Sequence, residues 1–452
     1  MLVLLADGVG TGAAIRENHR DAPPTAATRG VTSHAPLTPG DCTDGGTPIS
    51  HRFAAGSAWQ MCWRIDPHAG LVLSQIRYLA PGRNPLPVIK EMTLGQLEVP
   101  YDTGLDTTKD ITEVGFGGRN MIARSAVDCA GERINAILPN YGTGAVGGFE
   151  TRAVLCAEDR DTGLGRRSSY GGRLAASRGH SFDLSALSIV GWYEYLTVYS
   201  FADNGAITPQ LGATGDLSPK DHSTDPQWGS PAAGGAVSHR HNAIWRIRWD
   251  LGGPQTVQEY NAEFTGRTGP KAPILAGSWS PLTHESTRRA APRRFWQVLG
   301  PHRNPNGHRI SYTISNDATA GHGYDVAFSQ HNPCELYASD NLLAGCPTET
   351  VPQFVSDHQP LSDVVSWIAV SFHHVPRPED RSPMEMHWQG FTTTPFAAFP
   401  HNPLIQAEAV SGRRDSALHL GRPLGDVRRV TDGGGLGAGD RLGCGAIVDG
   451  CR

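Results

Sequence analysis

The stretch that decides the fold reads WQMCWRI (59–65), DPHAG (66–70) and LVLSQIRY (71–78). Apolar and polar side chains alternate along both flanks, which is the two-residue period of a strand with one buried face. The Pro and Gly between the flanks favour a turn. This segment is therefore predicted to be a β-hairpin.

Similar strand-like segments recur along the chain, and Gly- and Pro-rich turns separate them. The 452 residues include 54 Gly and 33 Pro, which suits many short strands better than long amphipathic helices. The further predicted strands are VIKEMTLGQLEV (88–99), RINAILP (133–139), TRAVLCAE (151–158), the long apolar run 187–201, NAIWRIRWDL (242–251), RISYTI (309–314) and VVSWIAVSF (364–372). The predicted fold class is all-β, with one large antiparallel β-sandwich.

Both ends of the chain differ in composition from the middle. Residues 1–45 are rich in Gly, Ala, Thr and Pro and predict an irregular lead-in. Residues 413–452 are Gly-rich and poor in core residues, which predicts a surface-draped or mobile tail. The ordered domain is expected between them, over 46–412.

Charge and hydropathy argue against two classes of partner. The chain has 39 basic and 44 acidic residues and a formal charge of -5, too weak to favour nucleic acid or an acidic membrane surface. No run of about 18 apolar residues is present, and the opening stretch is short and lacks a basic flank. Neither a membrane span nor a clear signal peptide is predicted.

The eight cysteines form four couples that are close in sequence: Cys42 with Cys62, Cys129 with Cys156, Cys334 with Cys346, and Cys444 with Cys451. An even number without a CxxC metal pair favours disulfides in an oxidising compartment, and hence a secreted or extracytoplasmic protein. The alternative is buried free thiols in a cytoplasmic protein.

One histidine pair could hold a metal. His239 and His241 flank Arg240, and residues i and i+2 of a strand face the same side, about 6 to 7 Å apart. The alternative is a pair of solvent-facing histidines, because a chain with 19 histidines produces such pairs by chance.

Two longer segments resemble the copper amine oxidases. HRHNAIWRIRWDLGG (239–253) is similar to the copper-binding strand of that family, and SWIAVSFHHVPRPEDRSPM (366–384) to its later strand and loop. That loop carries the family's third histidine ligand directly before an x-P-R step, which is His374 here. The resemblance extends over about 59–403. It implies a Cu(II) ion held by His239, His241 and His374, on the family's catalytic β-sandwich.

The segment SIVGWYEYLTVYSFADNG (188–205) resembles the family's cofactor strand, T-x-x-N-Y-D/E-Y, in which the first tyrosine is oxidised to topaquinone. Tyr193 is the matching residue. Ile189 stands in place of the Thr and Trp192 in place of the Asn, which in the family helps to orient the quinone. Without the resemblance, these tyrosines would be read as core aromatics.

The segment LGQLEVPYDTGLDTTKDITEVGFGG (94–118) resembles the part of the family that carries the catalytic base. Asp110 matches the base, and Tyr101 matches the tyrosine that hydrogen-bonds a quinone oxygen. Asp102 and Asp106 remain alternatives for the base, and all three acids could instead lie in a solvated turn.

The resemblance also implies a disulfide between Cys129 and Cys156. Two acids, Asp250 and Asp363, match the family's peripheral calcium site. Arg248 and Gly252 stand where further ligands are expected, and calcium needs several oxygen ligands, so this site is doubtful.

The function implied by the resemblance is copper- and topaquinone-dependent oxidative deamination. A primary amine and O2 would yield an aldehyde, ammonia and hydrogen peroxide, and the family implies a homodimer. Trp192 keeps one alternative open, a non-catalytic copper-binding β-sandwich. A further alternative is a quinone-free copper oxidase or cyclase of a specialised biosynthetic pathway.

Overall fold

The computed structural model describes residues 37–38, 41–139, 148–169, 174–316, 323–341 and 343–405. The compact unit that contains the strands ends at Leu404. The predicted tail 413–452 and most of the predicted lead-in 1–45 lie outside the described residues. The domain boundaries therefore stay predictions.

Nine strands within the described ranges form the first sheet. Their order is β1 (Thr47–Arg52), β2 (Ala58–Asp66), β3 (Gly70–Leu79), β4 (Leu86–Pro100), β13 (His239–Trp249), β20 (Val364–His374), β19 (Val326–Gln330) and β16 (Ser286–Arg288), with β5 (Thr107–Lys109) paired to β4. The predicted hairpin is confirmed, because β2 and β3 pair antiparallel from Asp66 opposite Gly70.

Eleven strands of the described part form the second sheet. Their order is β15 (Pro273–Leu282), β14 (Thr256–Thr268), β17 (Arg294–Arg303), β18 (Arg309–Ser315), β22 (Thr392–Phe396), β10 (Ile207–Gly215), β9 (Tyr193–Ala202), β8 (Ala175–Val190), β7 (Phe149–Ser168) and β6 (Glu132–Pro139), with β21 (Met384–Gly390) paired to β10. A separate short pair joins β11 (Gly229–Ser230) to β12 (Ala236–Val237).

The helices found in the described residues are single turns. They are α1 (Asp110–Glu113), α2 (Val351–Phe354) and the 3₁₀ turns at Gly118–Asn120, Pro231–Ala233, Val355–Asp357 and Pro378–Asp380. In that part of the chain, no helix is long and apolar enough to cross a bilayer.

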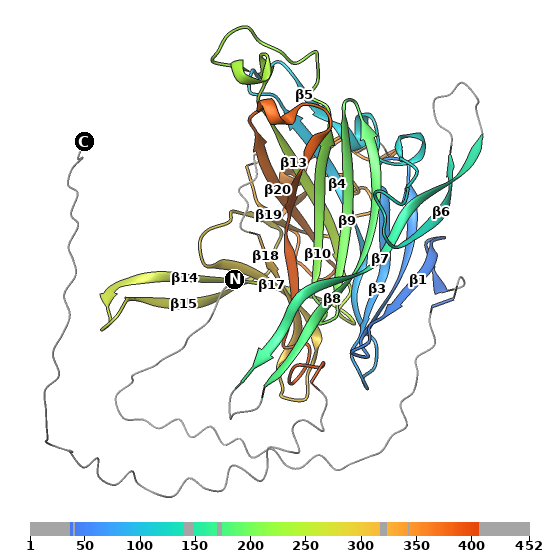
Figure 1. The fold of residues 1–452 in the computed structure, drawn as a ribbon. Helices are drawn as coiled ribbons and strands as arrows, with labels where there is room; N and C mark the ends of the chain where they lie inside the picture. Colours follow the sequence, from blue (N-terminus) through green and yellow to red (C-terminus); the bar gives the residue numbers. More distant parts are fainter. Residues whose placement is uncertain are drawn as a thin grey trace, which may run out of the picture. The chain divides into compact units, whose positions relative to one another are not determined.

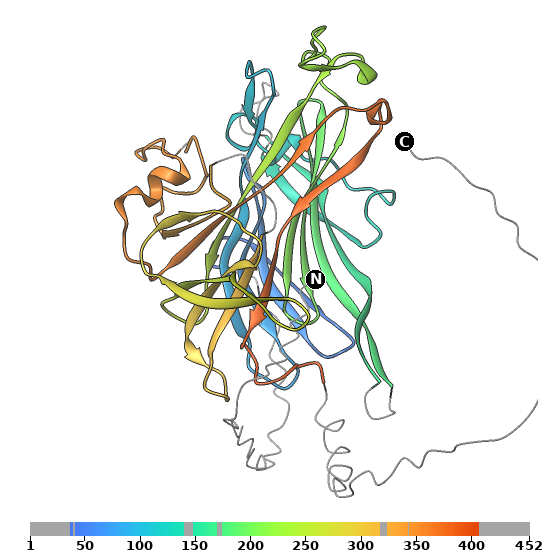
Figure 2. The same cartoon turned by 90° about the vertical axis from the view of Figure 1, so that its left-hand side faces the viewer.

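The two sheets lie against each other (Figures 1 and 2). Large aromatic side chains fill the space between them. The rings of Trp59 and Phe201 lie 5.1 Å apart, and those of Tyr199 and Trp245 lie 5.3 Å apart. Each pair joins one strand of the first sheet to β9 of the second. Burying one such side chain contributes about 1.5 to 3 kcal/mol. The predicted all-β antiparallel sandwich is confirmed.

The first sheet is also covered on its other face, near β13, β19 and β20. A second apolar cluster there joins these strands to the segment around α2, and includes Ile244, Ala327, Phe354 and Trp367. The central strands are therefore buried on both sides, which fixes the backbone that carries the histidines.

The prediction of one strand over 187–201 is wrong. A turn at Gly191 and Trp192 divides the run, so β8 ends at Val190 and β9 begins at Tyr193. Gly191 has a φ of 62°, a left-handed conformation that glycine adopts without steric cost. The apolar pattern continues through the turn because both strands are largely buried. Tyr193 therefore lies at the end of a strand and not in its middle.

Three of the four cysteine couples form disulfides. Cys42–Cys62 and Cys129–Cys156 each have Cα atoms 5.8 Å apart, and the Cα atoms of Cys334–Cys346 are 5.3 Å apart. The pairing of Cys129 with Cys156, expected from the resemblance, is thereby confirmed. The fourth couple, Cys444 and Cys451, lies outside the described residues.

Candidate functional site

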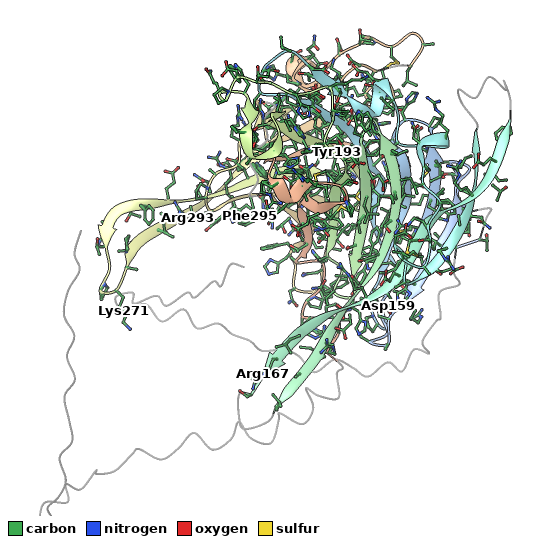
Figure 3. The ribbon with its side chains drawn as sticks, turned by 45° about the horizontal axis from the view of Figure 1, so that its top comes forward. Asp159, Arg167, Tyr193, Lys271, Arg293 and Phe295 are labelled. Carbon is green, nitrogen blue, oxygen red and sulfur yellow. A yellow bond between two sulfur atoms is a disulfide. The ribbon has the colours of Figure 1, made fainter. Side chains whose placement is uncertain are left out.

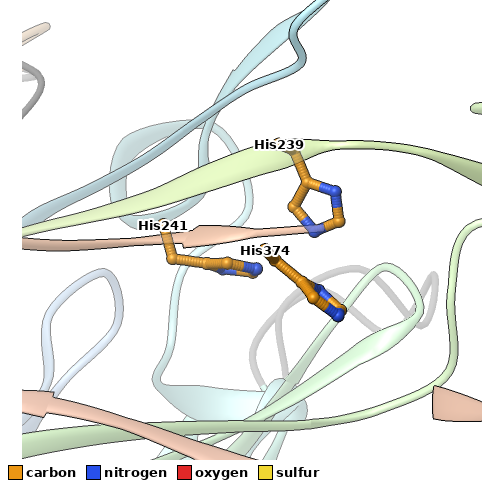
Figure 4. Close-up of side chains that lie close together, drawn as sticks. All are labelled: His239, His241 and His374. Carbon is orange, nitrogen blue, oxygen red and sulfur yellow. The ribbon is translucent and has the colours of Figure 1, made fainter. Parts of the chain in front are cut away.

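The three predicted metal ligands come together at one end of the first sheet (Figure 4). The antiparallel register of β13 and β20 places His239 directly opposite His374, and His241 lies two residues further along β13. All three side chains are at least 97% buried, and one ring nitrogen of each lies within 4.8 Å of the others. The tertiary structure thus joins the HxH pair to a distant third histidine.

Burial keeps these imidazoles neutral, as a metal ligand must be. It lowers the pKa of His239 to about 4, that of His241 well below its ordinary value, and that of His374 in the same direction. Within the described part of the chain, the buried Nε2 atom of His241 has no hydrogen-bond partner. An unpaired buried nitrogen is costly, so a metal ion at this nitrogen fits the site.

Hydrogen bonds orient the other two rings for the same purpose. Nδ1 of His239 lies 3.0 Å from the carbonyl oxygen of Val237, which leaves Nε2 for a metal. Nε2 of His374 lies 3.0 Å from Asp380 Oδ2, which leaves Nδ1. Partners of this kind fix the tautomer of a metal-binding histidine. Three neutral imidazoles are a donor set that suits copper.

Tyr193 lies against this triad. Its hydroxyl oxygen is 2.8 Å from Nε2 of His239 and 3.1 Å from Nδ1 of His374, the two nitrogens that face a metal. Burial raises the pKa of Tyr193 far above its usual value. The two departures from the family pattern lie outside the buried site, because Trp192 is 48% exposed and Ile189 is 42% exposed.

Of the three candidate acids, Asp110 alone is buried near the triad. It is the first residue of α1 and only 4% exposed. Burial raises its pKa to about 7, against hydrogen bonds from Thr108 and Tyr195 that lower it. Asp102 is instead paired with His373 at 2.7 Å, and Asp106 is exposed.

Tyr195 connects Asp110 to the triad. Its ring stacks on that of Tyr193, with centroids 5.8 Å apart, and on that of Phe116, 5.2 Å away. Its hydroxyl lies 3.2 Å from Nδ1 of His241. The candidate base and the histidine centre therefore share a buried hydroxyl.

Tyr101 also touches the triad. It forms an isolated antiparallel bridge with His239, and the two ring centroids are 4.8 Å apart. Its hydroxyl hydrogen-bonds Asp221, and burial raises its pKa. All six predicted site residues thus belong to one buried region.

The sequence analysis assigned no role to two neighbours of His374. Asp380 is almost fully buried. Burial alone would raise its pKa, but hydrogen bonds from Arg377 and His374 outweigh this and hold it at about 2. The ring of His387 lies 4.7 Å from that of His374. Asp380 belongs to the segment that resembles the family loop but received no role from it, whereas His387 has no local signal and is placed by the pairing of β21 with β10.

One of the two acids that match the calcium site, Asp363, is paired with basic side chains here. The carboxylate of Asp363 receives a hydrogen bond from Arg248 at 2.6 Å and lies 3.4 Å from the ammonium of Lys90. Arg248 and Lys90 thus occupy the neighbourhood of the carboxylate oxygens that calcium would need.

The fold and the site together define a β-sandwich protein with three buried histidines that could hold a metal ion, and a tyrosine hydroxyl between two of them. Residues 56–412 match the family described as copper amine oxidase, enzyme domain. The chain therefore belongs to the copper amine oxidase family.

Individual relatives are divergent. The chain is 25% identical over 423 residues to the histamine oxidase of Arthrobacter globiformis, covering 85% of this chain and 60% of the relative. It is 24% identical to copper amine oxidase 1 of Aspergillus niger, covering 77% of this chain and 56% of the relative. The chain thus spans less than two thirds of the length of these relatives.

Solved structures of the family share the fold. The copper-containing benzylamine oxidase of Hansenula polymorpha superposes with a TM-score of 0.66 at 20% identity, covering 76% of this chain and 60% of that one. The amine oxidase of Aspergillus nidulans gives a TM-score of 0.66 at 17% identity, covering 85% of this chain and 56% of that one.

Proposed function

We propose that this protein is a copper- and topaquinone-dependent primary-amine oxidase, which converts an amine and O2 into an aldehyde, ammonia and hydrogen peroxide. The observation that carries the proposal is the position of the Tyr193 hydroxyl, in hydrogen-bond contact with two histidines of a triad that suits copper. The names of relatives, histamine oxidase and diamine oxidase, support an amine substrate.

Copper with a quinone formed from Tyr193 would supply the electron-accepting and O2-reducing chemistry. The residues of the chain would provide the rest. His239, His241 and His374 would hold the metal, and Tyr101, whose ring contacts His239, would hydrogen-bond a quinone oxygen. Asp110 accepts a proton from the substrate carbon, because a buried carboxylate with a pKa of about 7 is a suitable base near neutral pH.

The test is an aerobic absorbance spectrum before and after adding Cu(II), with mass spectrometry of the peptide that contains Tyr193. A new visible band and a gain of about 30 Da on that peptide, two oxygens added and two hydrogens lost, would establish the quinone. Tyr193→Phe is the matched control, since it keeps the ring and should bind copper without the band. Copper uptake with an unmodified Tyr193 would overturn the proposal in favour of a quinone-free copper protein.

We further propose that the protein is a homodimer. The hairpin of β14 and β15 projects from the sandwich, with Lys271 near its tip (Figure 3). It exposes the apolar side chains of Phe264, Ile274, Leu275 and Trp279. Apolar groups gathered on a projecting arm favour contact with another chain. Light scattering after gel filtration tests this, and a monomer mass would refute it.

An oxidising compartment is proposed on the basis of the three disulfides. Alkylation of the unfolded natural protein without reductant should leave these six cysteines unlabelled. Labelling of all six would favour a reducing compartment instead.

A further inference from the structure

We propose that Tyr195 is a positioning residue, whose hydroxyl ties the candidate base Asp110 to the metal ligand His241 and holds His241 in the tautomer that binds copper through Nε2. The part that concerns Asp110 rests on the proposed amine-oxidase function. The part that concerns His241 depends only on the metal site.

The geometry places one hydroxyl between two functional groups. Tyr195 is 1% exposed and its ring is held by stacking on Phe116 and Tyr193. The hydroxyl oxygen lies 3.2 Å from Nδ1 of His241, and its interaction with the carboxyl of Asp110 lowers the pKa of that acid. In the described part of the chain this hydroxyl forms no hydrogen bond to a backbone carbonyl, so it serves these two side chains.

Chemistry indicates which atom carries each proton in the contacts between His241, Tyr195 and Asp110. A metal bound at Nε2 of His241 needs the lone pair of that nitrogen, so the proton of the imidazole lies on Nδ1 and is donated to the hydroxyl oxygen of Tyr195. The hydroxyl proton of Tyr195 can then be directed at the carboxylate of Asp110, which only accepts hydrogen bonds. The lone pair is left on Nε2, the buried nitrogen without a partner in the described part of the chain. The ionised base and the copper-binding tautomer therefore favour each other.

A tyrosine can also be buried for packing alone, and the same strand contains such a residue. Tyr199 lies four residues further along β9, is fully buried, and donates its hydroxyl to the backbone carbonyl of Leu71 at 3.2 Å. Loss of that hydroxyl would remove a structural hydrogen bond far from the histidines. Tyr199→Phe is thus a matched control for Tyr195→Phe.

The first measurement is a Cu(II) titration of the metal-free 452-residue chain against a competing chelator. Tyr195→Phe keeps the stacked ring and should weaken Cu(II) binding by about 10- to 100-fold, the usual effect of losing a hydrogen-bond partner of a metal ligand. Tyr199→Phe should bind as the unsubstituted chain does. Equal affinity in all three proteins would overturn the proposal.

A second variant tests the same proposal without relying on the folding of Tyr195→Phe. If Tyr195→Phe does not fold, Asp110→Ala removes the acceptor at the other end and should also weaken Cu(II) binding, although Asp110 touches none of the three ligands. Unchanged affinity there would overturn the proposal.

The link to Asp110 is tested by the pH dependence of kcat/KM. Loss of the donating hydroxyl should raise the pKa of Asp110, so the acid limb should move to higher pH in Tyr195→Phe and stay in place in Tyr199→Phe. An unmoved limb would overturn that link. Absence of amine turnover in the unsubstituted enzyme would refute the proposed function, while the copper titration would still decide the role of Tyr195.

Discussion

Replacing Asp110 with Asn should remove most amine turnover and, at the same time, stabilise the fold above neutral pH. The side chain is 4% exposed, and burial raises its pKa to about 7. In the unfolded chain the pKa of the same carboxyl is about 3.9. Between these two values the folded protein keeps a proton that the unfolded chain has lost.

The sign of the pH effect follows from this difference. The stabilisation is fully present below about pH 4 and is lost as pH rises through about 7, because the charged carboxylate must then be buried. At about 1.4 kcal/mol per pKa unit, the loss approaches about 4 kcal/mol. Asn does not ionise, so the variant should match the unsubstituted protein at pH 4 and exceed it in unfolding free energy at pH 8.

The assay is urea unfolding of the metal-free protein at several pH values, with kcat/KM measured on the copper-loaded enzyme. Loss of a general base should lower kcat/KM by about 10²- to 10⁴-fold. Asp106→Asn is the control, since this acid is exposed on the same loop and should alter neither quantity. A stability difference that does not grow with pH, or turnover retained by Asp110→Asn, would refute the reasoning.

Three further substitutions test the site and the fold. His241→Ala removes one of three nitrogen donors and should prevent stoichiometric copper binding after dialysis, measured by elemental analysis; full occupancy would contradict the triad. Cys129→Ser opens a disulfide that spans 27 residues to Cys156 and should cost about 2 to 4 kcal/mol in urea unfolding, whereas an unchanged midpoint would argue that the bond is absent. Trp245→Ala empties a fully buried inter-sheet position and should cost about 3 to 5 kcal/mol, while Trp228→Ala, at a 38% exposed position, should stay within about 0.5 kcal/mol. Similar losses in these two variants would contradict the assigned core.

Much of the fold can be predicted from short stretches of sequence, because the two-residue period of a strand with one buried face is a local property. The hairpin of β2 and β3 was predicted on this basis. The same period placed His239 and His241 on one face of one strand. It failed over 187–201, where the exposed turn at Gly191 and Trp192 carries no polar side chain.

The candidate site needed the resemblance to a family as well as local pattern. The third ligand, His374, was assigned by its place before an x-P-R step, and Asp110 by Gly115 and Gly117, which follow it as in the family. Asp102 and Asp106 stayed open as rivals, because sequence gives the spacing of acids but not their burial. The structure separates them by the surroundings of each carboxyl.

By itself, then, the sequence determined the all-β class, the hairpin of β2 and β3, the common face of His239 and His241, and the close cysteine couples. Only the tertiary structure decided that His374 lies opposite His239, that the Tyr193 hydroxyl meets both, and that Tyr195 joins His241 to Asp110. The reason is physical. Side-chain period depends on neighbours along the chain, whereas strand register, sheet packing and the pKa of a buried acid depend on groups that only folding brings together.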